Sequence, residues 1–333
     1  MRILEHSPLQ HLTTFGTAAN ARRLLLVDSM DDILNMPEPA GAGDRPLVVG
    51  GGSNILFTHD YDGTVIHLTD GRPMPSPDGD RLTVWAGNKL DDVVRHTLTH
   101  RLYGMENLTA IPGSVGGAVV QNAGAYGAEM ADVVEWVEVV DLATRQSRRL
   151  AREECAFGYR TSRFKQESGR FLVVQVGLHL SPTYTPNLGY AALAELPHQT
   201  AMQMRDSIAQ LRWQKLPRPE EYGSAGSFFK NPVVTESDYR RLLALLPDMP
   251  AAHPTAPQAD GTPQYKLSAG WLIDHAGWKG RTMGRAGVWP RQALVLYNTG
   301  HCTGDEVMRL ARAIQDDVMQ RYGVGLEPEA III

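Results

Sequence analysis

The pattern of apolar and polar positions predicts short strands in the first half of the chain. Runs of β-branched and aliphatic residues, separated by glycine and polar residues, are typical of strands. The sequence Asp31-Asp32-Ile33-Leu34 predicts a short helix between the first two runs, so we expect one βαβ-like unit there. The strand-like runs cover residues 23–27, 46–49, 64–68, 82–86, 133–140 and 171–178.

Helical spacing dominates the second half. Thr303 and Glu306 have the spacing of a capping box, and Gly323 stands where the last helix ends. The proline-rich segment 216–219 predicts a domain boundary, because proline interrupts a helix. We expect helices over residues 90–102, 200–214, 237–246, 268–275 and 304–322, followed by an extended segment over 324–333.

Composition and charge exclude several classes of function. The 333 residues exceed what one hydrophobic core usually serves, and a net charge of -5 without a basic block argues against a nucleic-acid partner. The amino terminus lacks the apolar region of a signal peptide, and no run is long enough to cross a bilayer. Cys155 and Cys302 lie far apart, which fits a reducing compartment. We therefore expect a cytoplasmic protein, with no membrane partner and with structural thiols.

His96 and His100 are four residues apart on the predicted helix over 90–102. This spacing can direct two imidazoles toward one metal ion, but no acidic or cysteine ligand accompanies the pair. We expect surface histidines and no metal site.

The first glycine-rich stretch, Gly50 to Asn54, follows a predicted strand and resembles the start of a dinucleotide-binding fingerprint. A complete fingerprint needs glycine where Ile55 stands, and the residues after it continue as a strand rather than as a helix. Consecutive backbone N–H groups can still form an anion nest, with Ser53 adding a donor. A plain tight turn is the alternative.

A second glycine-rich region runs from Ile111 to Ala118 and leads into residues 121–127. Its glycines allow the backbone to approach a large ligand closely, and Ser114 and Asn122 add donors. Two such regions in a strand-rich domain favour a nucleotide cofactor held mainly by the backbone.

The third stretch, residues 223–232, combines glycines, two serines, a lysine and a side-chain amide with two phenylalanines. The aromatic pair would anchor the segment and hold Ser224 or Ser227 in a fixed direction, although a simple glycine-serine loop is equally consistent with the composition. A nucleophile elbow requires glycine at position 229, where phenylalanine stands, so acyl transfer is disfavoured.

Taken in order, these motifs resemble the UDP-N-acetylenolpyruvoylglucosamine reductase (MurB) family, and the resemblance covers nearly the whole chain. The motifs that carry it are Thr13–Gly16, Gly50–Asn54, Glu106–Leu108, Pro112–Gly127, Phe157–Arg160, Gly226–Pro232, Ala269–Asp274, Gln292–Val295 and Leu326–Glu329. The family implies an α+β protein with an FAD-binding fold of the vanillyl-alcohol-oxidase (PCMH) type in two subdomains and a separate substrate-binding domain.

On this chain the resemblance implies three parts. Residues 1–68 would form the first FAD-binding subdomain, to which a strand over 325–333 returns. Residues 69–215 would form the second subdomain and residues 216–324 the substrate-binding domain.

The resemblance implies that Arg160, Ser227 and Glu329 are catalytic in an NADPH-dependent reductase. Hydride from reduced FAD would add to the vinyl carbon of an enol ether, leaving negative charge that a guanidinium such as Arg160 stabilises. Ser227 is implied as the general acid that protonates the neighbouring carbon. Glu327 and Glu329 face the same side of an extended segment, so their spacing does not choose between them, whereas the family motif implies Glu329.

The remaining contacts are also implied by the resemblance. Tyr190 would be the mobile tyrosine that closes over the substrate in one branch of the family, and Lys215 is either a substrate contact or a solvated helix end. Substrate contacts are implied for Tyr126, Tyr190, Lys215, Asn231 and Gln292. FAD contacts are implied for Gly50, Gly51, Gly52, Ser53, Asn54, Pro112, Gly113, Ser114, Gly117, Asn122, Gly124 and Tyr159.

Two stretches depart from the family pattern. Residues 288–291, Val-Trp-Pro-Arg, stand where relatives often carry histidine before a Gln-Ala motif, and residues 330–333 lack the arginine and terminal glycine that are common there. The reading we favour is a monomeric flavoenzyme that uses NADPH to reduce a UDP-sugar enolpyruvyl ether to UDP-N-acetylmuramate for peptidoglycan synthesis. An FAD oxidase and a flavin or nucleotide-sugar binding module remain as rivals.

Overall fold

The computed structural model describes residues 1–37, 44, 46–257 and 261–333, which form an α+β protein. Contacts between residues group the chain into two compact units. The first unit contains residues 1–12, 20–52 and 60–214, and the second contains residues 13–19, 53–59 and 215–333. Each unit is therefore assembled from segments that are far apart in the sequence.

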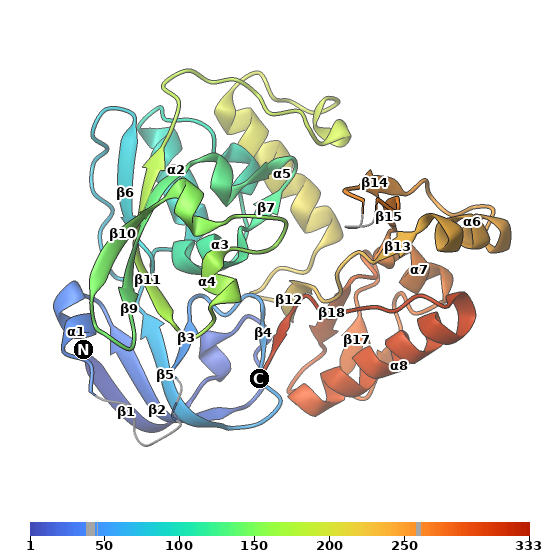
Figure 1. Ribbon diagram of the computed structural model, residues 1–333, viewed down its shortest axis with the longest axis horizontal. Helices are drawn as coiled ribbons and strands as arrows, with labels where there is room; N and C mark the ends of the chain where they lie inside the picture. Colours follow the sequence, from blue (N-terminus) through green and yellow to red (C-terminus); the bar gives the residue numbers. More distant parts are fainter. Residues whose placement is uncertain (38–43, 45, 258–260) are drawn as a thin grey trace. The chain divides into compact units, whose positions relative to one another are not determined.

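One sheet of the first unit is mainly parallel. Its strand order is β1-β2-β5-β3, where β1 is antiparallel to β2 and the other neighbours are parallel (Figure 1). The predicted βαβ-like unit is confirmed, because α1 connects β2 and β3, which are both parallel to β5, the strand that lies between them. The bounds are β1 (Arg2–Pro8), β2 (Asn20–Val27), α1 (Met30–Leu34), β3 (Leu47–Val49) and β5 (Tyr61–Leu68).

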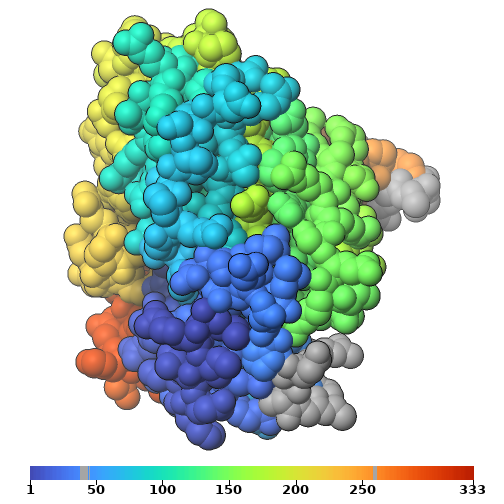
Figure 2. Space-filling view, turned by 90° about the vertical axis from the view of Figure 1, so that its left-hand side faces the viewer, coloured from blue at the N-terminus to red at the C-terminus, as the bar shows by residue number. Residues whose placement is uncertain are grey.

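The other large sheet of the first unit is antiparallel, in the order β10-β9-β11-β6. Side chains from both sheets, such as Leu25 and Val174, belong to one buried hydrophobic cluster. The bounds are β6 (Arg81–Trp85), α2 (Leu90–Thr99), α3 (Val115–Gln121), β7 (Gly124–Ala125), β8 (Ala128–Glu129), β9 (Val134–Asp141), β10 (Ser147–Ala151), α4 (Arg163–Gln166), β11 (Phe171–His179) and α5 (Ala201–Lys215). Figure 2 shows the blue, cyan and green residues of this unit side by side on one face.

The second unit is built around the sheet β12-β18-β17-β16, along which α8 packs (Figure 1). A smaller sheet, β13-β15-β14, lies beside α6, and β19 pairs in parallel with β4. The bounds are β4 (Ile55–Leu56), β12 (Gly223–Ser227), β13 (Val233–Thr235), α6 (Glu236–Leu245), β14 (His253–Thr255), β15 (Gln264–Lys266), α7 (Ala269–His275), β16 (Thr282–Met283), β17 (Ala286–Val288), β18 (Val295–Asn298), α8 (Gly304–Tyr322) and β19 (Ile331–Ile332).

Short 3-10 helices punctuate the connections. They are η1 (Gln10–Leu12), η2 (Glu106–Leu108), η3 (Met130–Asp132), η4 (Arg152–Cys155) and η5 (Ala191–Leu193).

The end signals of α8 are confirmed. The Thr303 hydroxyl accepts from the Glu306 backbone N–H while the Glu306 carboxylate accepts from the Thr303 N–H, and Gly323 ends the helix at φ 67°. The predicted strands and the other predicted helices also lie where expected, with small shifts at their ends. The helix α2, for example, ends at Thr99 rather than at Leu102.

The loop reading of residues 223–227 is wrong, and so is the description of Ser224 as a loop residue. These residues form β12, because the neighbouring strand β18 supplies partners for their backbone groups. Glycine and serine have low strand propensity, so a tertiary contact outweighs the local preference here.

The thiols of Cys155 and Cys302 are buried and make no disulfide. Burial raises the pKa of Cys155 to about 12 and that of Cys302 to about 11, so both remain protonated at neutral pH. Among the described residues, no helix is long and apolar enough to cross a membrane, and no cluster of histidine, cysteine and acidic side chains is arranged to hold a metal ion.

Candidate active site

The two glycine-rich loops of the first unit lie directly against each other. A Cβ atom on Gly51 would stand 2.4 Å from the Cα of Gly113, and one on Gly50 would stand 2.4 Å from the Ser114 hydroxyl oxygen. Only glycine permits backbones this close. The structure therefore unites two loops that lie more than sixty residues apart in the sequence.

The neighbouring residues show which groups are available to a ligand. Ser114 caps α3, where its hydroxyl accepts from the Gly117 backbone N–H at 3.3 Å. Gly117 itself is exposed, and a Cβ there would make only an ordinary contact. The Tyr159 side chain is 59% exposed, and the Arg160 guanidinium lies 5.4 Å from the centroid of its ring. The exposed backbone at Gly117 allows the close approach of a large nucleotide cofactor.

Asn122 has a structural task inside this unit. Its side chain is fully buried, donates to the Gly158 carbonyl at 3.0 Å and accepts from the Ala131 N–H at 3.0 Å. Its φ of 44° ends α3 in the left-handed region. These bonds tie the loop after α3 to the segment that carries Tyr159 and Arg160, and a direct contact of Asn122 with a cofactor stays a prediction.

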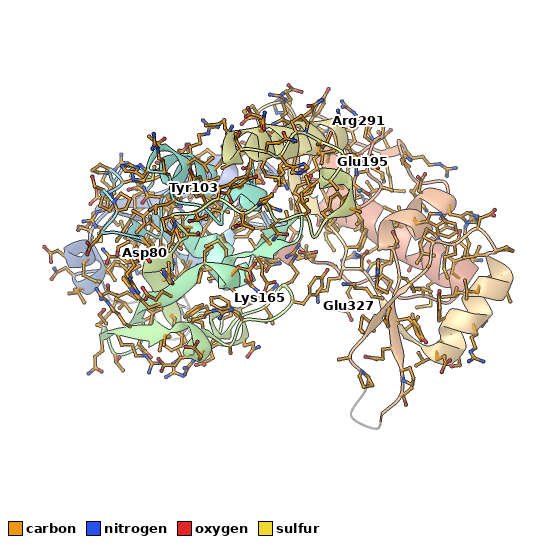
Figure 3. All side chains as sticks on the ribbon, turned by 90° about the horizontal axis from the view of Figure 1, so that it is seen from above. Asp80, Tyr103, Lys165, Glu195, Arg291 and Glu327 are labelled. Atoms are coloured by element: carbon orange, nitrogen blue, oxygen red, sulfur yellow. The ribbon has the colours of Figure 1, made fainter. Side chains whose placement is uncertain are left out.

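Arg160 is held in a defined conformation. Its backbone has φ 55°, in the left-handed region that non-glycine residues rarely adopt, and its carbonyl accepts from the Lys165 ammonium at 3.0 Å (Lys165 is labelled in Figure 3). The Arg160 guanidinium donates to the Gly124 carbonyl at 2.7 Å. Such strain persists only where surrounding contacts impose it, and it is common at functional sites.

An aromatic pair from distant segments stands in the same unit. The rings of Tyr126 and Tyr190 meet edge to face with centroids 5.1 Å apart. The Asn107 side-chain amide donates to the carbonyls of Tyr126, at 2.6 Å, and Asn187, at 3.0 Å, and so fastens the two segments together. Tyr190 remains 37% exposed, so its ring is accessible to a ligand.

The residue that motif reasoning missed beside this pair is Arg212, on α5. Burial lowers the pKa of the Arg212 guanidinium, and the hydroxyl of Tyr126 is close enough to interact with its charge. The Nε atom is buried and has no hydrogen-bond partner in the described part of the chain. An arginine at the helical spacing of α5 looks like a surface residue in the sequence, so only the fold reveals it.

In the second unit, Ser227 and Glu329 lie on neighbouring extended segments. The Glu329 backbone N–H donates to the Phe228 carbonyl at 2.7 Å, and the Lys230 N–H donates to the Glu327 carbonyl at 2.9 Å. Phe228 and Phe229 are fully buried, as their predicted anchoring role requires. Ser227 is half-buried. Along the chain it follows the bulge in β12 and directly precedes Phe228.

The structure distinguishes the two glutamates of this segment. The Glu327 side chain is 78% exposed and pairs with the Lys230 ammonium at 3.2 Å, whereas Glu329 is half-buried (Glu327 is labelled in Figure 3). The Asn54 side chain donates to the Glu329 carbonyl at 3.2 Å, so Asn54 braces the segment. The boundary between the two units passes between Gly52 and Ser53, so Ser53 and Asn54 belong to the second unit.

A cavity of about 280 Å³ in the second unit contains two of the predicted substrate contacts, Asn231 and Gln292. The Asn231 side-chain oxygen accepts from the Ala269 N–H at 3.0 Å, and the Gln292 oxygen accepts from the Leu294 N–H at 3.3 Å. Arg291 and Lys279 also line this cavity and add positive charge to it. Lys215 is the exposed last residue of α5.

Trp289, in the stretch that departs from the family pattern, packs against aromatic side chains of this unit. The indole is 6% exposed and lies against the rings of Tyr222 and Tyr297, with centroids 5.1 and 5.2 Å away. Trp289 therefore fills space at the end of the β12-β18-β17 sheet.

Comparison with known proteins defines the class. A family model described as "FAD binding domain" matches residues 21–148, and one described as "UDP-N-acetylenolpyruvoylglucosamine reductase, C-terminal domain" matches residues 218–333. Together with the α+β architecture, these matches make the chain an FAD-binding oxidoreductase.

Relatives along the whole chain specify the family. A UDP-N-acetylenolpyruvoylglucosamine reductase of Burkholderia ambifaria is 44% identical, covering 100% of this chain and 97% of the relative. One of Azoarcus sp. is 42% identical, covering 100% and 98%. The crystal structure of the enzyme of that name from Thermus caldophilus is similar, with a TM-score of 0.71 at 26% identity over 99% of this chain and 98% of that one. The chain belongs to the UDP-N-acetylenolpyruvoylglucosamine reductase family.

Proposed function

We propose that this protein reduces the enolpyruvyl group of UDP-N-acetylglucosamine enolpyruvate to UDP-N-acetylmuramate, with NADPH as the reductant. The observation that carries the proposal is the pairing that places Ser227 and Glu329 on neighbouring segments, within a chain that matches the reductase family from end to end. The product is a precursor of peptidoglycan, and nucleotide-sugar precursors of this kind are made in the cytoplasm. We further propose that the protein acts there as a monomer.

FAD, when bound, accepts hydride from NADPH and supplies it to the substrate. The glycine loops around Gly51 and Gly113 would hold this cofactor through their backbones, with Tyr159 available for stacking. Ser53 and Asn54 are further proposed contacts of the cofactor. No metal is required for this reaction.

Arg160 would stabilise the intermediate. When hydride adds to the terminal vinyl carbon, the electron pair of the double bond moves onto the α-carbon and the carboxylate. A guanidinium fixed in place stabilises this developing negative charge without having to reorganise. The bond from Arg160 to the Gly124 carbonyl and the strained backbone at φ 55° support such fixation.

Ser227 would then donate its hydroxyl proton to the α-carbon, which completes the addition of one hydride and one proton across the double bond. Glu329 would share a proton with Ser227 or with the substrate carboxylate. The half-buried position of Glu329 favours it over the solvated Glu327, which is paired with Lys230. A carbanion-like acceptor allows a hydroxyl to act as the general acid.

The nucleotide part of the substrate would meet two groups of residues. Tyr190, with Tyr126 beneath it, would close over the diphosphate, and Arg212 supplies a positive charge beside them. Asn231 and Gln292 would bind from their cavity, and Lys215 would contribute a second positive charge. We also propose that the chain belongs to the branch of the family that retains the tyrosine loop.

Anaerobic half-reactions test the proposal. The purified protein is expected to show a flavin spectrum that NADPH bleaches and the enolpyruvyl sugar nucleotide restores. Ser227→Ala should leave reduction by NADPH within about twofold, while the second half-reaction slows by about 10² to 10⁴-fold, the usual contribution of a general acid. Ser224→Ala, on the same strand, is the matched control and should behave like the unaltered protein.

The rival functions predict other results. An oxidase would reoxidise with oxygen and an alcohol, regardless of the sugar nucleotide, and a binding module would be yellow but inactive. Equal loss of both half-reactions in Ser227→Ala would show that Ser227 has another task.

A further inference from the structure

The segment Thr13–Gly16 is a motif to which the proposed reaction assigns no role. It belongs to the second unit, where it runs beside the start of β12. The Thr14 hydroxyl donates to the Ser224 carbonyl at 2.6 Å, and the Ser224 backbone N–H donates to the Thr14 carbonyl at 3.1 Å. The Asn298 side chain, at the end of β18, donates to the Phe15 carbonyl at 3.2 Å. The segment therefore adds a short extended stretch beside β12, at the edge of the sheet β12-β18-β17-β16.

This contact ends just before an irregularity in β12. Ser224 pairs with Tyr297 and Ser227 pairs with Val295, so two residues of β12 have no regular partners between these pairs. One of them, Gly226, has φ 68°. A bulge of this kind reorients the side chains that follow it, because each shift of one residue turns a side chain to the opposite face of the strand.

Ser227 is thus held from both sides of the bulge. Beyond it, the Phe228 N–H donates to the Leu294 carbonyl at 2.7 Å, and the Phe228 carbonyl accepts from Glu329. Before it, the bonds from Thr14 fix Ser224. If either side were released, the bulge could move along the strand and change the direction in which the Ser227 hydroxyl points.

We infer that Thr14 is a positioning residue for Ser227. Its hydroxyl bonds β12 on the edge opposite β18, so it fixes the strand at the last regular pair before the bulge. Thr14 acts through the backbone and does not itself transfer a proton. This inference rests on the proposed role of Ser227 as the general acid.

Thr14→Val tests it, because valine keeps the shape of threonine and removes the hydroxyl donor. The matched control is Thr17→Val, three residues further along the chain, where the Thr17 hydroxyl donates to the Phe57 carbonyl at 3.0 Å instead of to β12. Each variant leaves one backbone carbonyl without its donor, so both should lose thermal stability. Only Thr14→Val should slow the proton-transfer step.

In anaerobic stopped-flow measurements, Thr14→Val should reduce flavin with NADPH at a rate within about twofold of the unaltered protein. Its second half-reaction should slow by about tenfold, the equivalent of one hydrogen bond of about 1.4 kcal/mol. The solvent deuterium isotope effect on that step should rise, since proton transfer becomes more rate-limiting. Thr14→Ser should restore both the rate and the isotope effect.

Equal slowing in Thr14→Val and Thr17→Val, an unchanged isotope effect, or failure of Thr14→Ser to restore the rate would each overturn the inference. Thr14→Cys, which lacks the methyl group of threonine but keeps a weaker donor at the γ position, replaces valine if Thr14→Val does not fold, and an intermediate rate is then expected. Ser227→Ala is measured in parallel. If it leaves the second half-reaction intact, the proposed function fails; if it slows that step while Thr14→Val does not, only the present inference fails.

Discussion

The glycine-rich stretches of the two units look alike in the sequence, yet they need glycine for different physical reasons. At Gly51 in the first unit, the backbone of Gly113 occupies the place of a side chain, with its Cα 2.4 Å from a Cβ built there. At Gly226 in the second unit, no described atom lies within 4 Å of such a Cβ, but φ is 68°. Gly51 is needed because a side chain would have no room, and Gly226 is needed because the backbone there has positive φ.

This difference separates two tasks. In the first unit, close packing brings two backbones together, and these loops carry the predicted cofactor contacts. In the second, a single unusual conformation turns a strand so that Ser227 is presented from a bulge. Substitutions by alanine distinguish the two, because alanine adds volume and also disfavours positive φ.

The largest effect is expected from Gly51→Ala. The added methyl group meets backbone atoms of Gly113 and Ser114 that cannot rotate away, so the two loops must separate. Overpacking of this kind costs roughly 1–3 kcal/mol and should also disrupt the cofactor surface. We expect a lower melting temperature and protein that purifies with little flavin. The flavin content is measured as the ratio of absorbance at about 450 nm, near the flavin maximum, to absorbance at about 280 nm, near the protein maximum. Retention of full flavin content would contradict the close packing of the loops.

A smaller effect on stability is expected from Gly226→Ala, since there is space for the methyl group and only the positive φ is unfavourable. The expected loss is about 1 kcal/mol. Flavin content should stay unchanged, while the second half-reaction slows because Ser227 follows directly. Gly226→Asn should be milder, because asparagine tolerates this region better than alanine does. If the two variants are equally slow, the conformation at residue 226 does not control Ser227.

The smallest effect on stability is expected from Gly117→Ala. This glycine is helical and exposed, and a Cβ would touch only the Ser114 hydroxyl, at 3.5 Å. Alanine should therefore raise stability by about 0.5–1 kcal/mol, measured by thermal unfolding of the flavin-free protein. If Gly117 contacts FAD, as predicted, the affinity for flavin should fall at the same time. Higher stability with unchanged flavin affinity would remove Gly117 from the cofactor site.

Motif reasoning predicted most of the candidate site without the fold. The two glycine loops, the anchoring phenylalanines and the end signals of α8 were all readable, because they depend on backbone freedom, on burial of large apolar side chains and on local capping. The family resemblance, confirmed by relatives along the whole chain, added the reaction and FAD.

Other features depend on residues that meet only after folding. The pairing of β12 with β18, the position of β5 between β2 and β3, and the burial of Arg212 beside Tyr126 all join segments separated by many residues. A local pattern carries no information about which distant segment supplies a hydrogen-bond partner or excludes water. For the same reason, the different exposure of Glu327 and Glu329 became visible only in the structure.

The sequence by itself therefore determined the elements, the glycine loops and the family, since these follow from residue type and order. Only the tertiary structure decided how they are used: that Gly51 packs against Gly113, that residues 223–227 become a strand, and that Thr14 holds that strand beside the bulge before Ser227. Hydrogen bonds and close packing between distant segments determine these features, because they outweigh the weak local preferences of glycine and serine.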